Sequence, residues 1–325
     1  MKILYIIGNG LDIAHHMKTS YQDFFKFYLS VPTDDNDIEA MKKDIDKNKY
    51  ETWADLEIGL GTYASHCINK SVFLKCLNDI KVNLKVYLEK ESDKISNYSL
   101  FSSLEFRRPE LLLDPEPKNR YDMYYGHLSN SSYSYIDVIT FNYTLTLESL
   151  FKYDGSSLVI NNNAKLVSLL HVHGTLDNMM VMGVNDSNQI SNIGFNTDLD
   201  VLEEFVKPEY NDACLNNKNE VCTNLIQNAD IIVLYGTSLG LSDSKWWRLI
   251  GKRMETDNYP LLVYLPYDKN KNQVAEPNHL RRWTKGYVNE IREKFSIKLD
   301  ENILASRICI ALNKRLFQIK KTPIT

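Results

Sequence analysis

The sequence predicts an α/β fold whose mostly parallel sheet is flanked by helices. Residues 2–7 are apolar and end at Gly8-Asn9-Gly10, after which a helix-like segment follows. This strand, glycine turn and helix order is typical of a Rossmann-like nucleotide-binding domain. Further apolar segments recur downstream, at 135–141, 166–172, 230–235 and 261–265. The segment 230–235 is almost wholly apolar, as expected of a parallel strand that is covered on both faces.

The length and composition are those of a chain that can bury a full core. It has 325 residues, of which 43% are hydrophobic. That length corresponds to about two domain-equivalents, or to one α/β domain with large insertions. The formal net charge of −4 argues against a general nucleic-acid-binding protein. No apolar run approaches the roughly 18 residues that span a membrane, and residues 3–7 are too short for the apolar region of a signal peptide.

The cysteines point to a reducing environment. There are five of them, an odd number, and none forms a C-x-x-C pair. This spacing gives neither a zinc site nor a disulfide framework. We therefore expect no metal site and a cytoplasmic location.

A mainly helical insertion is expected after the first strand, at residues 21–130. Thr19 or Ser20 is placed to cap a helix that begins at Tyr21. The charged segment 32–50 is interpreted as an exposed insertion. In the next predicted helix, Glu57 is a weaker site candidate, and a solvated helix face is the favoured interpretation.

The rest of the insertion is expected to contain one or two helices over residues 71–106. A proline-rich loop over 107–117 follows them, because prolines this dense break regular structure. Beyond the strand at 135–141, residues 159–163 suggest an extra strand and residues 179–184 a hairpin return.

Two closing helices are expected, at 288–295 and 302–317. The predicted organisation is a nucleotide-binding core made of residues 1–20 and 131–270, the insertion 21–130, and C-terminal helices in 271–325 that pack on the core.

Several predicted strands end in a polar or glycine-containing signature. The four signatures are Gly8-Asn9-Gly10-x-Asp12, Thr140-Phe141-Asn142-Tyr143-Thr144, His171-Val172-His173-Gly174 and Gly236-Thr237-Ser238-Leu239-x-x-x-Asp243. Ligands of open parallel sheets bind beyond the carboxyl ends of the strands. The signatures therefore predict one ligand site at that edge. A tight strand-to-helix turn without a ligand is the alternative account of the first signature.

The order of these motifs resembles the bacteriophage abortive-infection AbiH family over nearly the whole chain. The motifs that carry the resemblance are Ile7-Gly8-Asn9-Gly10-x-Asp12, Trp53-x-Asp55-Leu56-Glu57, Phe141-Asn142-Tyr143-Thr144, Val172-His173-Gly174, Gly183-Val184-Asn185-Asp186, and Gly236-x-Ser238-Leu239-x-x-x-Asp243 with Trp246-Trp247. More distantly, the same signatures resemble the sirtuin-like NAD-binding fold. Sirtuin-like domains of bacterial antiphage systems hydrolyse NAD⁺, and the resemblance implies that activity here.

Two departures from the sirtuin pattern matter. The zinc-binding cysteine pairs of sirtuin deacylases are missing, which argues against protein deacylation. Thr144 stands where the sirtuin-like motif has an aspartate that contacts the sugar.

If the protein hydrolyses the nicotinamide–ribose bond, Asn142 and His173 are the residues expected to take part in the reaction. The bond breaks through an oxocarbenium-like transition state, and its cationic leaving group needs no general acid. Asn142 can hold a ribose hydroxyl and a water, unless it only caps the loop after its strand. His173 suits a general base near neutral pH, whereas His171 is better explained as a structural histidine.

The remaining site candidates have both a functional and a structural interpretation. The residues expected to contact the nucleotide are Gly8, Asn9, Gly10, Asp12, Thr140, Thr144, Gly174, Gly236, Thr237, Ser238 and Asp243. Asp12 and Asp243 are equally explained as helix-start residues that the helix dipole favours. The polar turn at Asn185, Asp186 and Gln189 is a candidate lining of the site. Trp246 and Trp247 are expected in the core or at a subunit contact.

Three functions remain open. The first is an NAD⁺-consuming enzyme of phage defence, which must be silent in uninfected cells. It therefore implies a phage-derived trigger and a regulatory state, expected to be a homo-oligomer. The second is a non-catalytic sensor of NAD⁺ or a related ADP-ribose nucleotide. The third is a nuclease toxin, for which the basic C-terminal residues are better explained as a solvated helix end.

Overall fold

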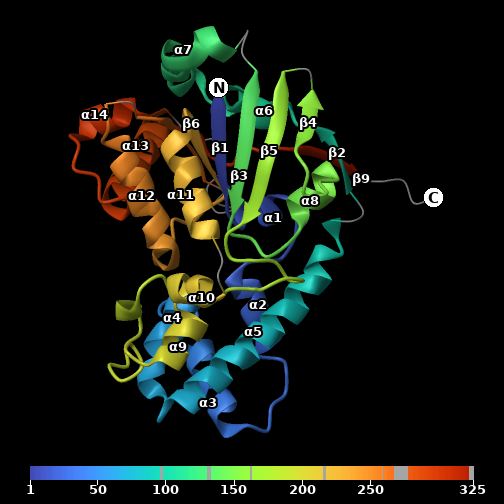
Figure 1. Cartoon of the computed structure of the whole chain (residues 1–325), viewed down its shortest axis with the longest axis vertical. Coiled ribbons are helices and arrows are strands. Elements are labelled where there is room, and N and C mark those ends of the chain that lie inside the picture. Colours follow the sequence, from blue (N-terminus) through green and yellow to red (C-terminus); the bar gives the residue numbers. More distant parts are fainter. Residues whose placement is uncertain are drawn as a thin grey trace.

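The computed structural model contains a seven-stranded sheet at its centre (Figure 1). It describes residues 1–95, 98–129, 133–161, 163–214, 217–257, 259–266 and 277–321. In sheet order the strands are β4 (Leu158–Asn161), β5 (Ala164–His171), β3 (Ser134–Thr140), β1 (Lys2–Ile7), β6 (Ile231–Tyr235), β7 (Leu261–Leu265) and β8 (Ile308–Ile310). All neighbours pair in parallel except β4 and β5. The predicted α/β class with a mostly parallel sheet is confirmed.

The connections of the sheet reverse direction between β1 and β6. From β1 the chain proceeds outward to β3 and β5 on one side, and later to β6, β7 and β8 on the other. This is the doubly wound order in which the two halves leave a crevice at the carboxyl ends of the central strands. The glycine turn after β1 and the one after β6 meet at that crevice.

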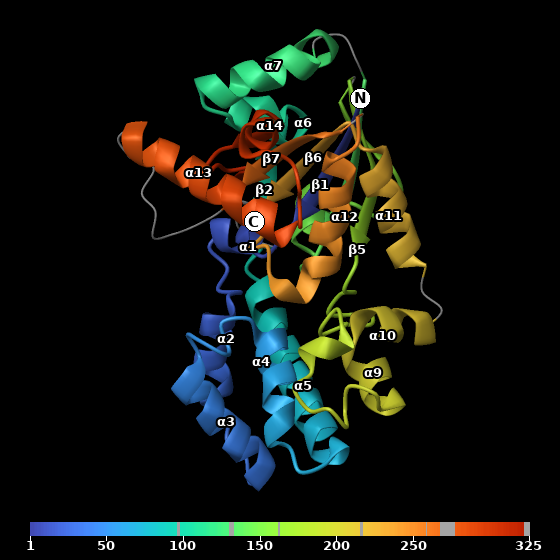
Figure 2. The ribbon, with the colours of Figure 1, turned by 90° about the vertical axis from the view of Figure 1, so that its left-hand side faces the viewer.

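Strand β1 separates two apolar cores. Alternate side chains of a strand point to opposite faces, so Ile3, Tyr5 and Ile7 join one core while Leu4 and Ile6 join the other. The first core is covered by α6 (Leu104–Arg107), the 3₁₀ helix η3 (Pro109–Leu112), α7 (Pro115–Ser129) and α8 (Thr146–Phe151). The second is covered by α11 (Lys218–Asn228), α12 (Ser244–Met254), α13 (Pro277–Lys294) and α14 (Glu301–Ser306), seen beside the sheet in Figures 1 and 2.

A separate helical layer lies beyond the carboxyl ends of the strands, below the sheet in Figure 1. It has its own apolar core, to which residues from both 24–88 and 176–206 contribute. Its helices are α2 (Tyr21–Tyr28), α3 (Asn36–Asn48), α4 (Leu56–Tyr63), α5 (Lys70–Ser92), α9 (Leu199–Phe205) and α10 (Lys207–Ala213). The layer therefore joins two segments that are far apart in the sequence.

Short elements complete the structure. Helix α1 (Gly10–Ala14) follows the first glycine turn. Strands β2 (Tyr98–Ser102) and β9 (Gln318–Lys321) form a small antiparallel sheet. The remaining 3₁₀ helices are η1 (Ala64–His66), η4 (Ser187–Gln189) and η5 (Leu241–Asp243). None of the helices in the described ranges combines the length and apolarity that a bilayer crossing requires.

The helix predicted at 302–317 is wrong. Helix α14 ends at Ser306, and Ile308–Ile310 instead forms strand β8 against β7. All three residues of β8 are buried, because they extend the sheet by one strand. The C-terminal segment therefore contributes strands as well as helices.

Three local predictions also need correction. Residues 107–117 are not a plain loop, because Pro109 opens η3 and Pro115 opens α7. Proline is tolerated at the first helical position, where its missing N–H has no partner to lose. Residues 179–184 form no strand, although the chain turns back before them and the Val181 N–H donates to the His173 oxygen at 2.8 Å; Val184 makes an isolated bridge to another segment. Segment 32–50 is not merely exposed, since helix α3 buries Met41 and Ile45.

The start of helix α2 agrees with its prediction. Ser20 is the N-cap, and its side-chain oxygen accepts a hydrogen bond of 3.2 Å from the backbone N–H of Asp23. Satisfying a free N–H in this way typically stabilises a helix by about 1 kcal/mol. The cap also fixes where Tyr21 enters the space between the sheet and the helical layer.

Candidate functional site

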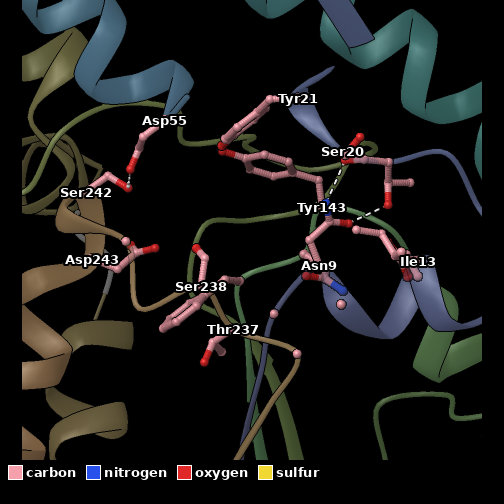
Figure 3. A pocket seen from close by; sticks show the side chains of 18 of the residues that line it. Asn9, Ile13, Ser20, Tyr21, Asp55, Tyr143, Thr237, Ser238, Ser242 and Asp243 are labelled. Carbon is pink, nitrogen blue, oxygen red and sulfur yellow. Dashed lines mark hydrogen bonds between the residues drawn. The ribbon is translucent and has the colours of Figure 1, made fainter. Parts of the chain in front are cut away.

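A cavity of about 380 Å³ lies at the crevice between β1 and β6 (Figure 3). This size falls within the range of small-molecule pockets. The cavity is lined by residues of all four predicted signatures: Gly8, Asn9, Gly10 and Asp12, then Asn142 and Thr144, then His173, then Gly236, Thr237, Ser238 and Asp243. The helical layer closes the cavity from the opposite side with Tyr21, Asp55 and Glu57.

Two predicted site residues lie outside the cavity lining. The Thr140 hydroxyl donates to the backbone oxygen of Ile7 over 3.3 Å, at the end of the sheet. Gly174 has a φ of 73°, and a Cβ atom there would lie 1.9 Å from the backbone oxygen of Met179. Both residues therefore shape the backbone next to the site.

The two glycine turns contact each other. The N–H of Gly8 donates to the Tyr235 oxygen at 2.9 Å, and that of Gly10 to the Gly236 oxygen at 2.8 Å. A Cβ at Gly10 would lie 2.4 Å from the Gly236 Cα. Glycine is thus required here for two loops to approach, which is the structural alternative considered for the first signature.

Asn9 holds the segment that leads into helix α2. Its side-chain nitrogen donates to the backbone oxygen of Thr19 at 2.7 Å, and the Thr19 hydroxyl donates to the Asn9 side-chain oxygen. These bonds position the neighbouring residues Ser20 and Tyr21 at the cavity (Figure 3).

Asp12 is a buried carboxylate with two threonine partners. The hydroxyls of Thr144 and Thr146 each donate to it over 2.7 Å. Burial raises the pKa of Asp12 to about 6, although the two threonines and His171 oppose the shift. Thr144, from the second signature, is therefore a hydrogen-bond donor to Asp12 of the first signature.

A buried polar network joins the sheet to the helical layer. The Nε2 atom of His173 lies 2.8 Å from Oδ1 of Asp243, and Nζ of Lys207 lies 3.0 Å from the same oxygen. Lys207 also contacts Oε2 of Glu57 at 2.8 Å. The side chains of Lys207 and Glu57 are only 3% and 4% exposed, so water compensates neither charge. The prediction that Glu57 lies on a solvated helix face is wrong.

The network sets the charge of its members. Burial, assisted by Lys207, lowers the pKa of His173, so the imidazole is neutral at pH 7. Burial raises the pKa of Glu57 to about 7, against the opposing effect of Lys207. Burial alone would raise the pKa of Asp243, but Lys207 and His173 outweigh it and hold that pKa well below its usual range.

A neutral His173 has a defined tautomer in this setting. Its Nε2 faces the Asp243 carboxylate and therefore donates, which leaves Nδ1 as an acceptor. Nδ1 is buried and has no hydrogen-bond partner within the described part of the chain. The ring stacks on Phe141, with 5.3 Å between centroids. Together these contacts fix the ring and leave one nitrogen able to accept a proton.

The other polar groups of the lining differ in their partners. The side-chain amide of Asn142 forms no hydrogen bond with any described residue, whereas its backbone oxygen contacts His171 Nδ1 at 2.7 Å. The second nitrogen of His171 contacts Glu148 at 2.7 Å, as expected of a structural histidine. The hydroxyl of Thr237 is buried and unpartnered among the described residues.

Further lining residues, among them Asp55, Tyr21 and Tyr143, were not named as site candidates, although Asp55 and Tyr143 lie within motifs of the sequence. Asp55 caps helix α4 with one carboxylate oxygen and accepts from the Ser242 hydroxyl at 3.0 Å with the other. Tyr21 and Tyr143 also face the cavity (Figure 3). Tyr143 donates to the Val181 backbone oxygen at 3.0 Å. Lys207, outside every motif, has no sequence signal that would have placed it here.

Other predicted features are structural. Asp186 and Gln189 form a reciprocal cap on η4, and the polar turn that contains them lies outside the lining of this cavity. Trp246 and Trp247 are buried, as expected for core residues. The Trp247 ring nitrogen donates to the Gly240 oxygen at 2.8 Å.

Comparison with known proteins places this architecture in a family. A search of curated proteins found no match. The family model described as "Bacteriophage abortive infection AbiH" matches residues 4–265. That range runs from β1 to β7 and includes the helical layer and all four strand-end signatures. The chain belongs to the AbiH family of bacteriophage abortive-infection proteins.

Proposed function

We propose that this abortive-infection protein binds NAD⁺ in the strand-end cavity and hydrolyses its nicotinamide–ribose bond to arrest infected cells. The observation that carries the proposal is the neutral, buried His173, oriented by Asp243 at a cavity in the crevice of a doubly wound sheet. Nucleotides bind at this crevice in such sheets.

The reaction makes modest demands on the protein. The bond between ribose C1′ and the pyridinium nitrogen breaks, and its electron pair leaves with neutral nicotinamide. The ribose then carries oxocarbenium-like positive charge. The oxygen of a water forms the new bond to C1′, and the water gives up one proton. The products are nicotinamide, ADP-ribose and that proton.

His173 is suited to receive that proton. Its Nε2–H is held by Asp243, so the proton would bind at Nδ1. The imidazolium that forms would be stabilised by the adjacent carboxylate, the usual role of an acidic partner beside a catalytic histidine. General-base assistance of this kind contributes typically about 10²- to 10⁴-fold to rate.

Asn142 and the carboxylates supply the remaining functions. The free amide of Asn142 can bind a ribose hydroxyl or orient the water. The carboxylates of Asp55, Glu57 and Asp243 line the same cavity, where negative charge stabilises a developing cation. These residues come from three separate segments, and the fold brings them to one space.

A non-catalytic NAD⁺ sensor is the second candidate. Both oxygens of Asp12 are bonded to threonines, one of which is Thr144 in place of the sirtuin-like aspartate. This pair would therefore shape the cavity without contacting the sugar. Binding without hydrolysis needs only the remaining polar groups.

Chromatography of nicotinamide after incubation of purified protein with NAD⁺ tests the proposal. The variants are His173→Gln and Asn142→Ala, and the matched control is His66→Gln at an exposed histidine outside the cavity. We expect release by the wild type and the control, and at least about a 100-fold loss in His173→Gln. NAD⁺-dependent thermal stabilisation without release would favour the sensor. Absence of both release and stabilisation would refute nucleotide binding.

A further inference from the structure

We infer that the cavity recognises the positively charged nucleoside end of its ligand, while the phosphates lie outside it. A pyridinium nucleoside without phosphate is then a ligand in its own right. This inference rests on the proposed function and deepens it by naming the part of the dinucleotide that the cavity selects.

The charge of the lining favours a cation. Four carboxylate residues line the cavity: Asp12, Asp55, Glu57 and Asp243. The described residues of the lining include neither lysine nor arginine. Lys207 lies behind the lining, where Glu57 and Asp243 already neutralise it. A diphosphate in the same space would face uncompensated negative charge.

The glycine turn after β1 does not present its amides as a phosphate loop would. The N–H groups of Gly8 and Gly10 donate to backbone oxygens of the β6 segment, and that of Leu11 donates to Gly8 at 3.1 Å. A phosphate-binding turn leaves such groups free for the anion. Three amides that would hold a diphosphate in a related fold are therefore occupied by the protein itself.

The walls of the cavity suit a flat cation and a sugar. Aromatic rings of Tyr21, Phe141, Tyr143 and Trp247 line it. Aromatic faces attract cations, and more strongly where water is excluded. A buried polar atom without a partner in the described ranges, Thr237 Oγ1, also belongs to a lining residue. Unpartnered buried polar atoms are rare in folded proteins and are available to ribose hydroxyls.

Asp55 offers a substitution that changes charge with little change in shape. One of its oxygens caps helix α4, and asparagine is an equally good N-cap. The other accepts from Ser242, whose hydroxyl can instead accept from an asparagine amide. Asp55→Asn therefore removes one negative charge from the cavity. Asp46→Asn removes the same charge from a carboxylate that is 64% exposed on α3, and it serves as the control.

Equilibrium binding separates the two ends of the dinucleotide. The probes are NAD⁺, nicotinamide riboside (cationic, without phosphate), dihydronicotinamide riboside (neutral) and ADP-ribose (phosphates, without nicotinamide). Each is titrated against His173→Gln alone and against His173→Gln combined with Asp55→Asn or with Asp46→Asn, because the His173 substitution suppresses turnover. The wild-type protein is assayed in parallel for nicotinamide release from NAD⁺ and from the riboside.

The expected pattern depends on charge. Nicotinamide riboside should bind within about tenfold of NAD⁺, and the neutral dihydro form at least about tenfold more weakly. Asp55→Asn should weaken riboside binding by roughly three- to tenfold and leave ADP-ribose unchanged, with no effect of Asp46→Asn. ADP-ribose that binds as tightly as NAD⁺, with the riboside not bound, would overturn the inference.

The two proposals fail in different ways. Charge-selective riboside binding without nicotinamide release from either compound would support this inference and remove the proposed hydrolysis. Release from NAD⁺ with no binding or cleavage of the riboside would support hydrolysis and overturn this inference.

Discussion

Replacing Asp12 with asparagine removes a buried negative charge while conserving the size of the side chain. In the folded protein, burial raises the pKa of Asp12 from 3.8 to about 6. The folded state therefore binds the proton more tightly than the unfolded state does. Protonated Asp12 therefore stabilises the folded state fully below pH 3.8, and this stabilisation is lost as the pH rises through about 6.

The magnitude follows from the size of the shift. The pKa rises by about 2 units, and each unit corresponds to 1.36 kcal/mol, so ionised Asp12 costs about 3 kcal/mol at pH 8. Asparagine cannot ionise, and it can accept from one threonine and donate to the other. Asp12→Asn should therefore be more stable than wild type by up to about 3 kcal/mol at pH 8, and by roughly half of that at pH 5.

Urea unfolding at pH 8 and pH 5, followed by tryptophan fluorescence, measures the difference. The exposed-charge variant Asp46→Asn is the control and should stay within about 0.5 kcal/mol of wild type at both pH values. The reasoning is refuted if Asp12→Asn is less stable than wild type at pH 8, or if its advantage is the same at both pH values.

Three further predictions concern the network, the glycine turn and the histidine. Lys207→Met leaves two buried carboxylates without a cation and should lower the unfolding free energy in urea by about 3–5 kcal/mol. The double variant with Glu57→Gln should recover part of that loss. A loss under about 1 kcal/mol would contradict the burial of Lys207. In Gly10→Ala the new Cβ would lie 2.4 Å from the backbone of the loop between β6 and α12, and the unfolding free energy should fall by about 1–3 kcal/mol in the same assay. Gly286→Ala, in open space on α13, should leave stability unchanged or higher. Equal effects of the two substitutions would argue against the loop contact. Because the pKa of His173 is lowered from 6.5, the inflection that this histidine gives to nicotinamide release should lie below pH 6.5, apart from any inflection of Glu57 near pH 7. A second inflection above 6.5 that persists in Glu57→Gln would count against a neutral base.

The sheet and the edge that carries the site were predictable from local signals. A wholly apolar run such as Ile231–Tyr235 requires cover on both faces, and this points to a central parallel strand. Parallel strands share one carboxyl edge, so placing the signatures after their strands was enough to bring His173 and Asp243 into the same prediction.

The partners of Glu57 were not predictable in the same way. Lys207 is 150 residues away in the sequence, and a lysine at the start of a short helix is ordinarily solvated. Only the fold places Lys207, the first residue of α10, within reach of α4 and η5. The packing of the glycine turn was not predictable either, because the sequence does not show that Gly8 and Gly10 approach the loop after β6.

Strand β8 illustrates the limit for short elements. Its three residues follow a helix directly, and apolar content of this length is compatible with either structure. The free edge of β7 decides the outcome, because pairing there buries all three residues. Such a tertiary influence leaves no trace in the local sequence.

The central position of β1 has a consequence for how the chain folds during synthesis. Its residues Ile3–Ile7 are made well before both neighbouring strands, because Ile7 pairs with Thr140 on one side and Tyr235 on the other. At about 5–20 residues per second, the β6 partner emerges roughly 10 to 50 s after β1. During that interval a strand of high β-propensity has no sheet to join, which is the condition under which nascent chains associate with one another. Newly made protein should therefore depend on chaperones more strongly than the stability of the finished fold would indicate.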